Sequence, residues 1–325
     1  MKRITLRQLR VFEQVARLRS ISAAAGVCHL TQPAVSMQLK ALEQECELPL
    51  TELVGRQLRL TQAGEEVAAY ARRVQHELDE LDQRLAAMRG QQHGKLNVGI
   101  VSTAKYFASH MLAAFTQEHA GAELSLKVEN RAQILQLLAE NEIDIAIMGV
   151  PPEFLDAVAT PFADHPHGIV LPANHALAGT SKLRIGDLAE DSFLVREPGS
   201  GTRAVMERFF ASQSFSPRKV IQMTGNEAVK QAVMAGLGIG FLSLNTIGLE
   251  RGLGLVQVPT IAGLPVMRRW HVVHRRGKQL LPIAQAFRDF VRDSGGAYAA
   301  ASSSPPPARD PKSRSRKSDK TRKRR

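Results

Sequence analysis

Three segments of the chain combine side chains that could bind an anion. They are residues 102–105 (Ser-Thr-Ala-Lys), 197–203 (Glu-Pro-Gly-Ser-Gly-Thr-Arg) and 224–227 (Thr-Gly-Asn-Glu), and each lies at the start of a stretch with helical periodicity. The first turn of a helix has unpaired backbone N–H groups and a partial positive charge, so it can bind an anion. With the cations Lys105 and Arg203 beside them, the segments predict a site for a small anionic ligand if the fold brings them to one cleft.

Each segment also has a simpler interpretation. Ser, Thr and Asn are the residues that most often cap a helix, so a hydroxyl or amide there needs no ligand. For any single segment we prefer the cap, whereas three segments and two cations together favour an anionic effector. The predicted residues from these segments are Ser102, Thr103, Lys105, Ser200, Gly201, Thr202, Arg203, Asn226 and Glu227.

Other kinds of site are less well supported. The glycine-rich residues 236–240 run from a helical stretch into a strand-like one, whereas a dinucleotide-binding loop runs from strand into helix. His165, His167 and His175 have no cysteine or carboxylate partner at regular spacing, so we expect surface or cleft-lining histidines rather than metal ligands. Because no nucleophile has a neighbouring base and orienting group, we predict no enzyme activity, and we expect no cofactor or metal.

A second set of polar side chains lies within residues 20–43, which predict two short helices joined by a tight turn. Ser22 is the expected N-cap of the first helix, and Thr31 begins the second, with Pro33 in its first turn. Apolar residues at helical spacing would join the two helices, while outward positions carry Gln32, Ser36, Gln38 and Lys40. Such side chains can reach base edges or phosphates in a major groove, although an ordinary solvated helix has a similar polar face.

The flanking segments favour the DNA-binding interpretation. Residues 5–16 predict a further amphipathic helix, and residues 54–60 predict a hairpin with a glycine turn that carries Arg56 and Arg59. From residue 61 to 88 an apolar stripe repeats every three or four residues, which predicts one long helix that pairs with a second copy. The sequence therefore predicts a winged helix-turn-helix in a dimer, and two-fold symmetry predicts an interrupted palindromic DNA site.

The remaining chain predicts an α/β domain. After a turn-rich break at residues 90–94, strand-like runs such as 143–149 and 192–197 alternate with amphipathic stretches such as 104–119. At 325 residues with 44% hydrophobic content, the chain is long enough for two or more domains. It has no secretory leader and no run as long as a bilayer span, so we expect a soluble, cytoplasmic protein without a membrane partner.

Charge and cysteine content narrow the interpretation further. The net charge is +12, but residues 308–325 contain ten Lys or Arg and two Asp, so most of the excess lies there. We expect residues 296–325 to form a disordered basic tail that adds at most nonspecific phosphate contacts. Cys28 and Cys46 are too few and too far apart for a zinc site, and we interpret them as small core residues rather than a redox pair.

The first 90 residues resemble the DNA-binding end of LysR-type transcriptional regulators. The resemblance is carried by LRQLRVFEQVA, SAAAGVCHLTQPAVSMQLKALE and GRQLRLTQAGE, which occur in the expected order. It implies that Gln32, Pro33, Ser36 and Gln38 belong to the recognition helix and that Arg56 lies on the wing, with Lys40 added from the outward pattern.

The α/β part resembles the effector domain of the same family, which is similar to type 2 periplasmic binding proteins. This resemblance implies a first lobe from residues 95–163 and 270–294, a second lobe from 164–269, and an effector between them. Asn130, Arg131, Gly149 and Pro151 would then lie at strand ends facing the same cleft, as second-choice effector residues. The expected domains are 1–60 for DNA binding, 61–90 for the linker helix, 91–295 for the effector and 296–325 for the tail.

Residues 101–107, 141–152 and 161–167 look most like regulators of the RuBisCO operon of carbon-fixing bacteria. That resemblance implies activation of Calvin-cycle genes in response to a phosphorylated metabolite. The expected partners are double-stranded DNA, a small anionic effector, RNA polymerase and further copies of the chain, as a dimer and then a tetramer. Two alternatives stay open: a LysR-type regulator of sulfur or aromatic metabolism, and a metabolite-binding α/β protein with no operator.

Overall fold

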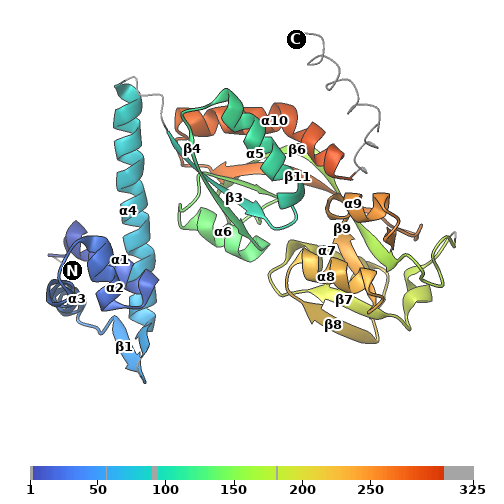
Figure 1. Ribbon diagram of the computed structural model, residues 1–325, viewed down its shortest axis with the longest axis horizontal. Helices are drawn as coiled ribbons and strands as arrows, with labels where there is room; N and C mark the ends of the chain where they lie inside the picture. The colour runs from blue at the N-terminus through green and yellow to red at the C-terminus, as the bar shows by residue number, and fades with distance from the viewer. Residues whose placement is uncertain (1–2, 56, 90–93, 181, 304–325) are drawn as a thin grey trace, which may run out of the picture.

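The computed structural model describes residues 3–55, 57–89, 94–180 and 182–303, and its first unit is three packed helices (Figure 1). These are α1 (Leu6–Leu18), α2 (Ile21–Cys28) and α3 (Gln32–Cys46). Thr31 caps α3 by accepting a hydrogen bond from the Ala34 N–H at 3.4 Å. Ser20, not the predicted Ser22, caps α2, because Ser22 already lies in the first helical turn.

A short hairpin and a long helix follow this unit. Strands β1 (Thr51–Val54) and β2 (Gln57–Leu60) pair antiparallel and form the predicted wing. Helix α4 (Gln62–Met88) packs its N-terminal part on α1, where Ala68 and Ala71 are buried. The stripe that the sequence analysis assigned to pairing with a second copy therefore packs within its own chain in this part, whereas Leu81, Leu85 and Met88 are exposed.

The remaining strands form one continuous sheet with the order β4-β3-β5-β11-β6-β9-β7-β8, and β10 pairs with β6. The first lobe has β3 (Lys95–Val101), β4 (Glu123–Glu129) and β5 (Ile145–Met148) with helices α5 (Lys105–Glu118) and α6 (Arg131–Ala139). The second has β7 (Ser192–Arg196), β8 (Lys219–Met223), β9 (Ile239–Ser243) and β10 (Val256–Gln257) with α7 (Gly201–Ser212), α8 (Asn226–Met234) and α9 (Gly248–Gly252). Short 3-10 turns, η1 (Ile185–Leu188) and η2 (Leu244–Thr246), complete the second lobe.

Two long strands pass between the lobes. They are β6 (Ala157–Pro172) and β11 (Val266–Arg275), which pair antiparallel from Val266 opposite His167 to Arg275 opposite Ala157. Each lobe has its own apolar core, with Phe107, Phe115 and Trp270 in the first and Phe193, Phe209 and Phe241 in the second. The predicted two-lobed α/β fold behind a winged helix-turn-helix is confirmed.

The last helix, α10 (Pro282–Ser303), packs on α5 and β6 of the first lobe. It corrects the prediction that disorder begins at residue 296, because residues 296–303 are helical. Ala299 is buried, and its carbonyl accepts a hydrogen bond from the Asn245 amide at 3.0 Å, so tertiary contacts stabilise an alanine-rich run with high helix propensity. The rest of the predicted tail, residues 304–325, lies outside the described part of the chain.

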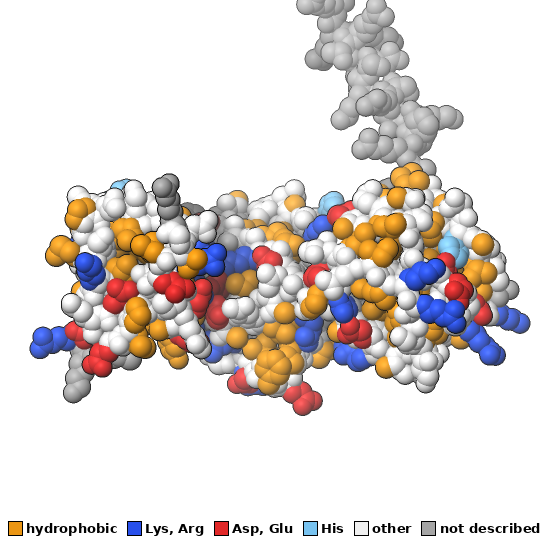
Figure 2. All heavy atoms as spheres, turned by 90° about the horizontal axis from the view of Figure 1, so that it is seen from below, with side chains coloured by type: hydrophobic (Ala, Val, Ile, Leu, Met, Phe, Trp, Pro, Cys, Tyr) orange, Lys and Arg blue, Asp and Glu red, His pale blue; other side chains and the backbone are white. Residues whose placement is uncertain are grey.

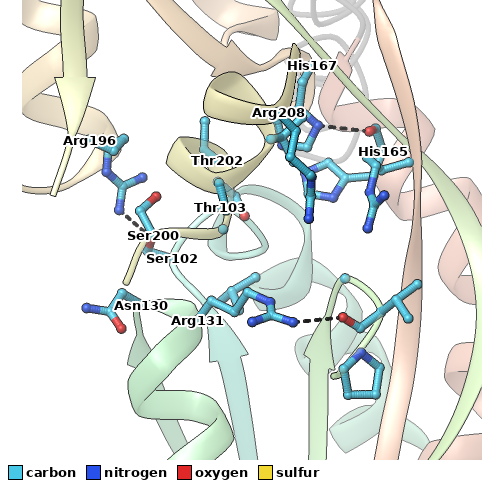
Figure 3. A pocket seen from close by; sticks show the side chains of 18 of the residues that line it. Ser102, Thr103, Asn130, Arg131, His165, His167, Arg196, Ser200, Thr202 and Arg208 are labelled. Atoms are coloured by element: carbon cyan, nitrogen blue, oxygen red, sulfur yellow. Dashed lines mark hydrogen bonds between the residues drawn. The ribbon is translucent and has the colours of Figure 1, made fainter. Parts of the chain in front are cut away.

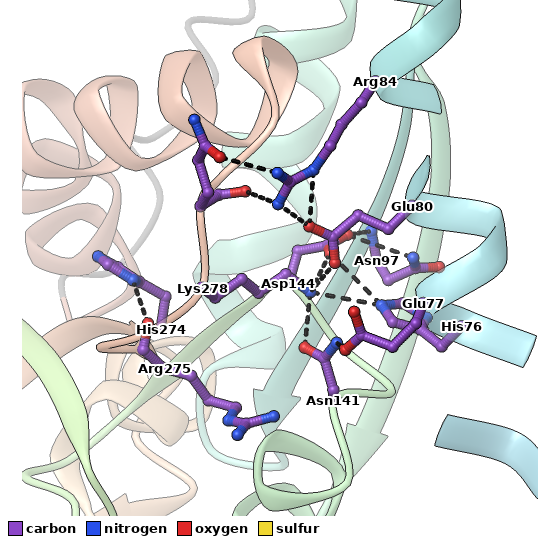
Figure 4. A network of polar contacts seen from close by, with 11 residues as sticks. His76, Glu77, Glu80, Arg84, Asn97, Asn141, Asp144, His274, Arg275 and Lys278 are labelled. Carbon is purple, nitrogen blue, oxygen red and sulfur yellow. Dashed lines mark hydrogen bonds and ion pairs between the residues drawn. The ribbon is translucent and has the colours of Figure 1, made fainter. Parts of the chain in front are cut away.

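A polar network joins α4 to the first lobe (Figure 4). Lys278 and Asp144, both only 6% exposed, form an ion pair at 2.7 Å, and Glu80 of α4 lies 3.9 Å from the same ammonium group. Arg72 of α4 donates to Glu142 at 2.8 Å. The linker helix therefore docks on the effector domain of its own chain through charged groups.

On the face seen in Figure 2, charged side chains of both signs are mixed, and hydrophobic side chains are scattered among them. Within the described part of the chain, no helix is both long enough and apolar enough to cross a membrane.

Candidate effector cavity and DNA-reading helix

A cavity of about 330 Å³ lies between the lobes, next to the crossover strands (Figure 3). Both lobes and both long strands contribute to its wall. Of the predicted effector residues, nine line it: Ser102, Thr103, Asn130, Arg131, Gly149, Pro151, Ser200, Gly201 and Thr202. The structure thus brings together segments that are up to 100 residues apart in the sequence.

Helix starts supply the hydroxyl and amide groups of the wall. Ser200 caps α7 by accepting from the Arg203 N–H at 3.4 Å, and Asn130 caps α6 by accepting from the Gln133 N–H at 3.0 Å. Thr103 and Thr202 are buried beside the cavity. Because helix capping satisfies only part of each first turn, these helix starts also present partial positive charge to the cavity.

Three arginines of the wall have no acidic partner among the described residues: Arg131, Arg208 and Arg268. Burial lowers the pKa of Arg131, and the positive charges of Arg208 and Arg268 lower it further. The pKa of Arg268 is likewise lowered by burial and then by Arg208. The three guanidinium groups therefore repel one another when the cavity holds no anion, and a bound anion would relieve that repulsion.

Arg196 is a fourth cation in the wall, and it is fully paired. It donates to Glu197 at 2.7 Å and to the Asn226 amide oxygen within the second lobe, and it donates across the lobes to the Ser102 hydroxyl. Although burial alone would raise the pKa of Glu197, hydrogen bonds from Arg196 and from the Gly225 N–H lower it to about 2. Arg196 therefore serves first to hold the wall in place.

Two histidines of β6 complete the wall. His165 stacks on Trp270 with ring centroids 3.6 Å apart and bonds the Ser243 hydroxyl at 3.0 Å, while His167 Nδ1 donates to the His165 carbonyl at 3.1 Å. Burial lowers the pKa of His165 well below its usual value and lowers that of His167 to about 4. Both imidazoles are accordingly neutral near pH 7 and can exchange hydrogen bonds with a ligand without adding charge.

The lobes also touch through backbone groups next to cavity-lining residues. The Ala132 N–H of the first lobe donates to the Gly199 carbonyl of the second at 3.2 Å. Gly199 has a φ of 82°, and a Cβ atom there would lie 3.1 Å from the Ala132 side chain. Only glycine fits this turn without strain, so the loop before α7 can close directly on the start of α6.

Four predicted effector residues lie away from the cavity wall. Lys105 and Glu227 face each other at 3.9 Å between α5 and α8, on a separate contact between the lobes. Arg203 points out of the cavity and bonds Glu207 and Gln222, each at 2.8 Å. Asn226 is buried behind Arg196. In this structure Lys105 and Arg203 therefore do not line the cavity, and each contacts neighbouring carboxylate or amide groups instead.

Sequence reasoning missed the residues that carry most of the charge in the cavity, Arg196, Arg208 and Arg268. For the two histidines of the wall, in contrast, the sequence did contain a signal. His165 and His167 lie two residues apart on a crossover strand, and the period of two places both on one face. The sequence analysis left two positions open for these histidines, the surface and the cleft, and in the structure both line the cavity.

The predicted DNA-reading residues lie on or beside the outer face of α3. Gln32, Pro33 and Lys40 are exposed, and Ser36 and Gln38 are half-buried on the flanks of that face. Arg56, the predicted wing contact, lies outside the described residues. The centre of the outward face is occupied by Met37, which is 69% exposed and which the sequence interpretation left out.

A winged helix-turn-helix joined by a long helix to a two-lobed domain with a cationic cavity defines a ligand-responsive, DNA-binding class of protein. Residues 6–65 match the bacterial regulatory helix-turn-helix protein family of lysR type, and residues 89–296 match the LysR substrate binding domain. The chain belongs to the LysR family of transcriptional regulators.

Named relatives are transcriptional regulators, and one of them is named for the RuBisCO operon. The RuBisCO operon transcriptional regulator of Allochromatium vinosum is 46% identical over 89% of this chain and 95% of its own length. The HTH-type transcriptional regulator CfxR of Cupriavidus necator is 44% identical over 90% of this chain and 92% of its own. The Synechocystis CcmR regulatory domain, solved in complex with 2-PG, is 37% identical with a TM-score of 0.58 and covers 62% of this chain and 97% of that domain.

Proposed function

We propose that the chain regulates transcription of carbon-fixation genes and activates them when a small phosphorylated anion binds in the cavity between its lobes. The observation that carries the ligand class is the charge of the wall. Arg131, Arg208 and Arg268 face the cavity without acidic partners, and no described residue that lines it is acidic. An anion with more than one negative charge satisfies such a wall best. As a DNA-binding regulator, the protein would act in the cytoplasm.

Calorimetric titration of the full-length chain tests the ligand class. The CcmR domain was solved with 2-phosphoglycolate, so this compound is the first probe, and glycolate is the matched compound without phosphate. We expect binding of the phosphorylated compound and a loss of about tenfold or more in the Arg131→Gln variant, since a charged hydrogen bond contributes about 1.5–3 kcal/mol. The control is Arg218→Gln, which removes an exposed ion pair with Glu190 on the second lobe.

The outcomes separate the possible ligands. Binding of sulfate or aromatic acids, and not of phosphorylated compounds, would be consistent with a transcriptional regulator but would contradict its assignment to carbon fixation. Equal losses of affinity in Arg131→Gln and Arg218→Gln would show that the ligand does not bind in the cavity.

Footprinting with the same protein tests DNA reading. We expect a discrete protected site in promoter DNA, and Gln32→Ala or Ser36→Ala should weaken binding to that site by about tenfold to a hundredfold. Binding to random DNA should change little, because phosphate contacts dominate there. An equal loss on both DNAs would contradict base reading by α3, and the absence of any discrete site would favour a metabolite-binding protein without an operator.

The proposed regulator works as a dimer that pairs into a tetramer and contacts RNA polymerase. Support for self-association comes from α4, where Leu81, Leu85 and Met88 are exposed apolar side chains on a helix otherwise rich in charge. Sedimentation of a Leu81→Glu, Leu85→Glu variant should show monomers where the parent chain shows dimers or tetramers. A variant of unchanged mass would contradict pairing through this helix.

A further inference from the structure

The recognition helix carries one large apolar side chain that is mostly exposed to solvent. Met37 lies on α3, 69% exposed, and belongs to neither apolar core of the helix-turn-helix. Val35, Leu39 and Leu42 of the same helix are buried in those cores. At 3.6 residues per turn, Met37 points almost directly away from this buried side. It is therefore the most outward-facing residue in the first half of the helix.

The neighbours of Met37 are suited to nucleic acid. Pro33 and Lys40 lie about one turn before and after it on the same face, and Ser36 lies on its flank, while Gln32 is the exposed first residue of the helix. Glutamine, serine and lysine bond base edges or phosphate oxygens, whereas a protein-docking surface of this size would contain several apolar side chains. Met37 lies about 7.5 Å along the helix axis from Gln32, so both reach the groove when the helix N-terminus enters it.

We propose that Met37 is a specificity-determining residue that contacts the 5-methyl group of a thymine in the major groove of the operator. The thymine methyl is the one apolar feature that unmodified base pairs present in that groove. A long, unbranched and polarizable side chain can follow a methyl group without a fixed geometry. This inference rests on the proposed DNA-binding function. It adds that Met37 recognises the methyl group of a thymine.

Single thymine-to-uracil substitutions test the contact, because uracil lacks only the methyl group. The probe is a duplex that the full-length chain selects from random DNA, and each thymine is replaced in turn. For the parent protein we expect a loss of about fourfold at one thymine or more per half-site, as for one buried methyl group. Met37→Ala should bind the unmodified duplex more weakly and be insensitive to uracil at the same positions, and Met37→Leu should retain the sensitivity.

Two controls test whether the effect is specific to Met37. Met267→Ala removes an exposed methionine from β11 of the effector domain and should leave the whole uracil profile unchanged. Because Met37 is exposed, its substitution should not alter folding, which circular dichroism checks. A Met37→Ala profile that keeps every uracil penalty of the parent overturns the proposal while specific DNA binding stands. Failure of the parent chain to select any duplex overturns the proposed function instead.

Discussion

Charged side chains connect the two lobes in two places, and the two places differ in charge balance. In the cavity wall, Arg131, Arg208 and Arg268 face one another without acidic partners among the described residues. At the second contact, which we call the Lys230 cluster, α5 supplies Lys105 and Tyr106, α8 supplies Glu227 and Lys230, and α9 supplies Glu250. The cationic side chains are thus unmatched in the cavity wall and neutralised by carboxylates in the Lys230 cluster.

The difference shows that a cationic side chain indicates a ligand site only when the fold gives it no acidic partner. Lys230 is 4% exposed and lies 2.7 Å from Glu250 and 3.1 Å from Glu227. Its ammonium group also lies 4.6 Å from the Tyr106 ring, so the buried charge is fully surrounded by protein groups. We therefore expect substitutions in the Lys230 cluster to change stability and those in the cavity wall to change anion binding.

The largest effect is expected from Lys230→Met. Removing the ammonium group leaves Glu250, which is only 15% exposed, without its cation, and breaking a buried pair costs about 3 kcal/mol or more of unfolding free energy. Anion affinity of the folded variant should stay within about twofold of the parent, because Lys230 does not line the cavity. Urea unfolding and calorimetric titration measure the two quantities. Adding Glu250→Gln should recover part of the stability, and no recovery would contradict the pairing.

Arg268→Gln should show the opposite behaviour. Loss of a charged hydrogen bond to the ligand is expected to weaken anion binding about thirtyfold. In the ligand-free protein the same change removes repulsion from Arg208 and Arg131, so the melting temperature should stay constant or rise. Thermal melts with and without 2-phosphoglycolate check both statements. A variant that melts lower without ligand would show that the wall is held together by Arg268 and is not strained by it.

The histidines of the wall predict a smaller effect that depends on pH. The pKa of His167 is about 4 in the folded protein and near 6.5 when unfolded, so the unfolded chain binds more protons between these values. Stability from His167 is therefore complete above pH 6.5 and is lost as the pH falls toward 4, by about 1 kcal/mol between pH 6.5 and 5.5. In urea titrations His167→Gln should lose less stability over this interval than the parent. An identical pH dependence would mean that the pKa of His167 is the same in the folded and unfolded states, which would contradict its lowering by burial.

The DNA-binding end was predictable from sequence because its determinants are local. Thr31 and Pro33 mark the start of α3 within a few residues, and the periodic Val35, Leu39 and Leu42 define its buried side. The N-cap of α2 was predicted at Ser22, two residues after the observed cap Ser20, because both serines are residues of the type that caps a helix. Nothing in such a pattern depends on another domain.

The cavity was predictable only in part because its determinants are not local. The capped helix starts at Asn130 and Ser200 could be found from residue type, and they do line the cavity. Which arginine of α7 faces the cavity depends on how that helix is rotated against the opposite lobe. Arg203 and Arg208 lie five residues apart, so they point in different directions, and the sequence interpretation chose the wrong one.

Lys105→Ala should have the smallest effect, although the sequence interpretation placed Lys105 among the ligand groups. Its ammonium group lies 3.9 Å from Glu227, both groups are well exposed, and Glu227 keeps the bonds from Tyr106 and Lys230 when Lys105 is removed. An exposed pair of this kind contributes about 0.2–1 kcal/mol, and at 3.9 Å we expect the lower half of that range, so the unfolding free energy should fall by about 0.5 kcal/mol or less. Affinity for 2-phosphoglycolate should be unchanged, in contrast to Arg268→Gln under the same conditions. If Lys105→Ala instead weakens binding as strongly as Arg268→Gln, the two contacts between the lobes are not separate, and closure on the ligand must recruit Lys105 from the Lys230 cluster into the cavity.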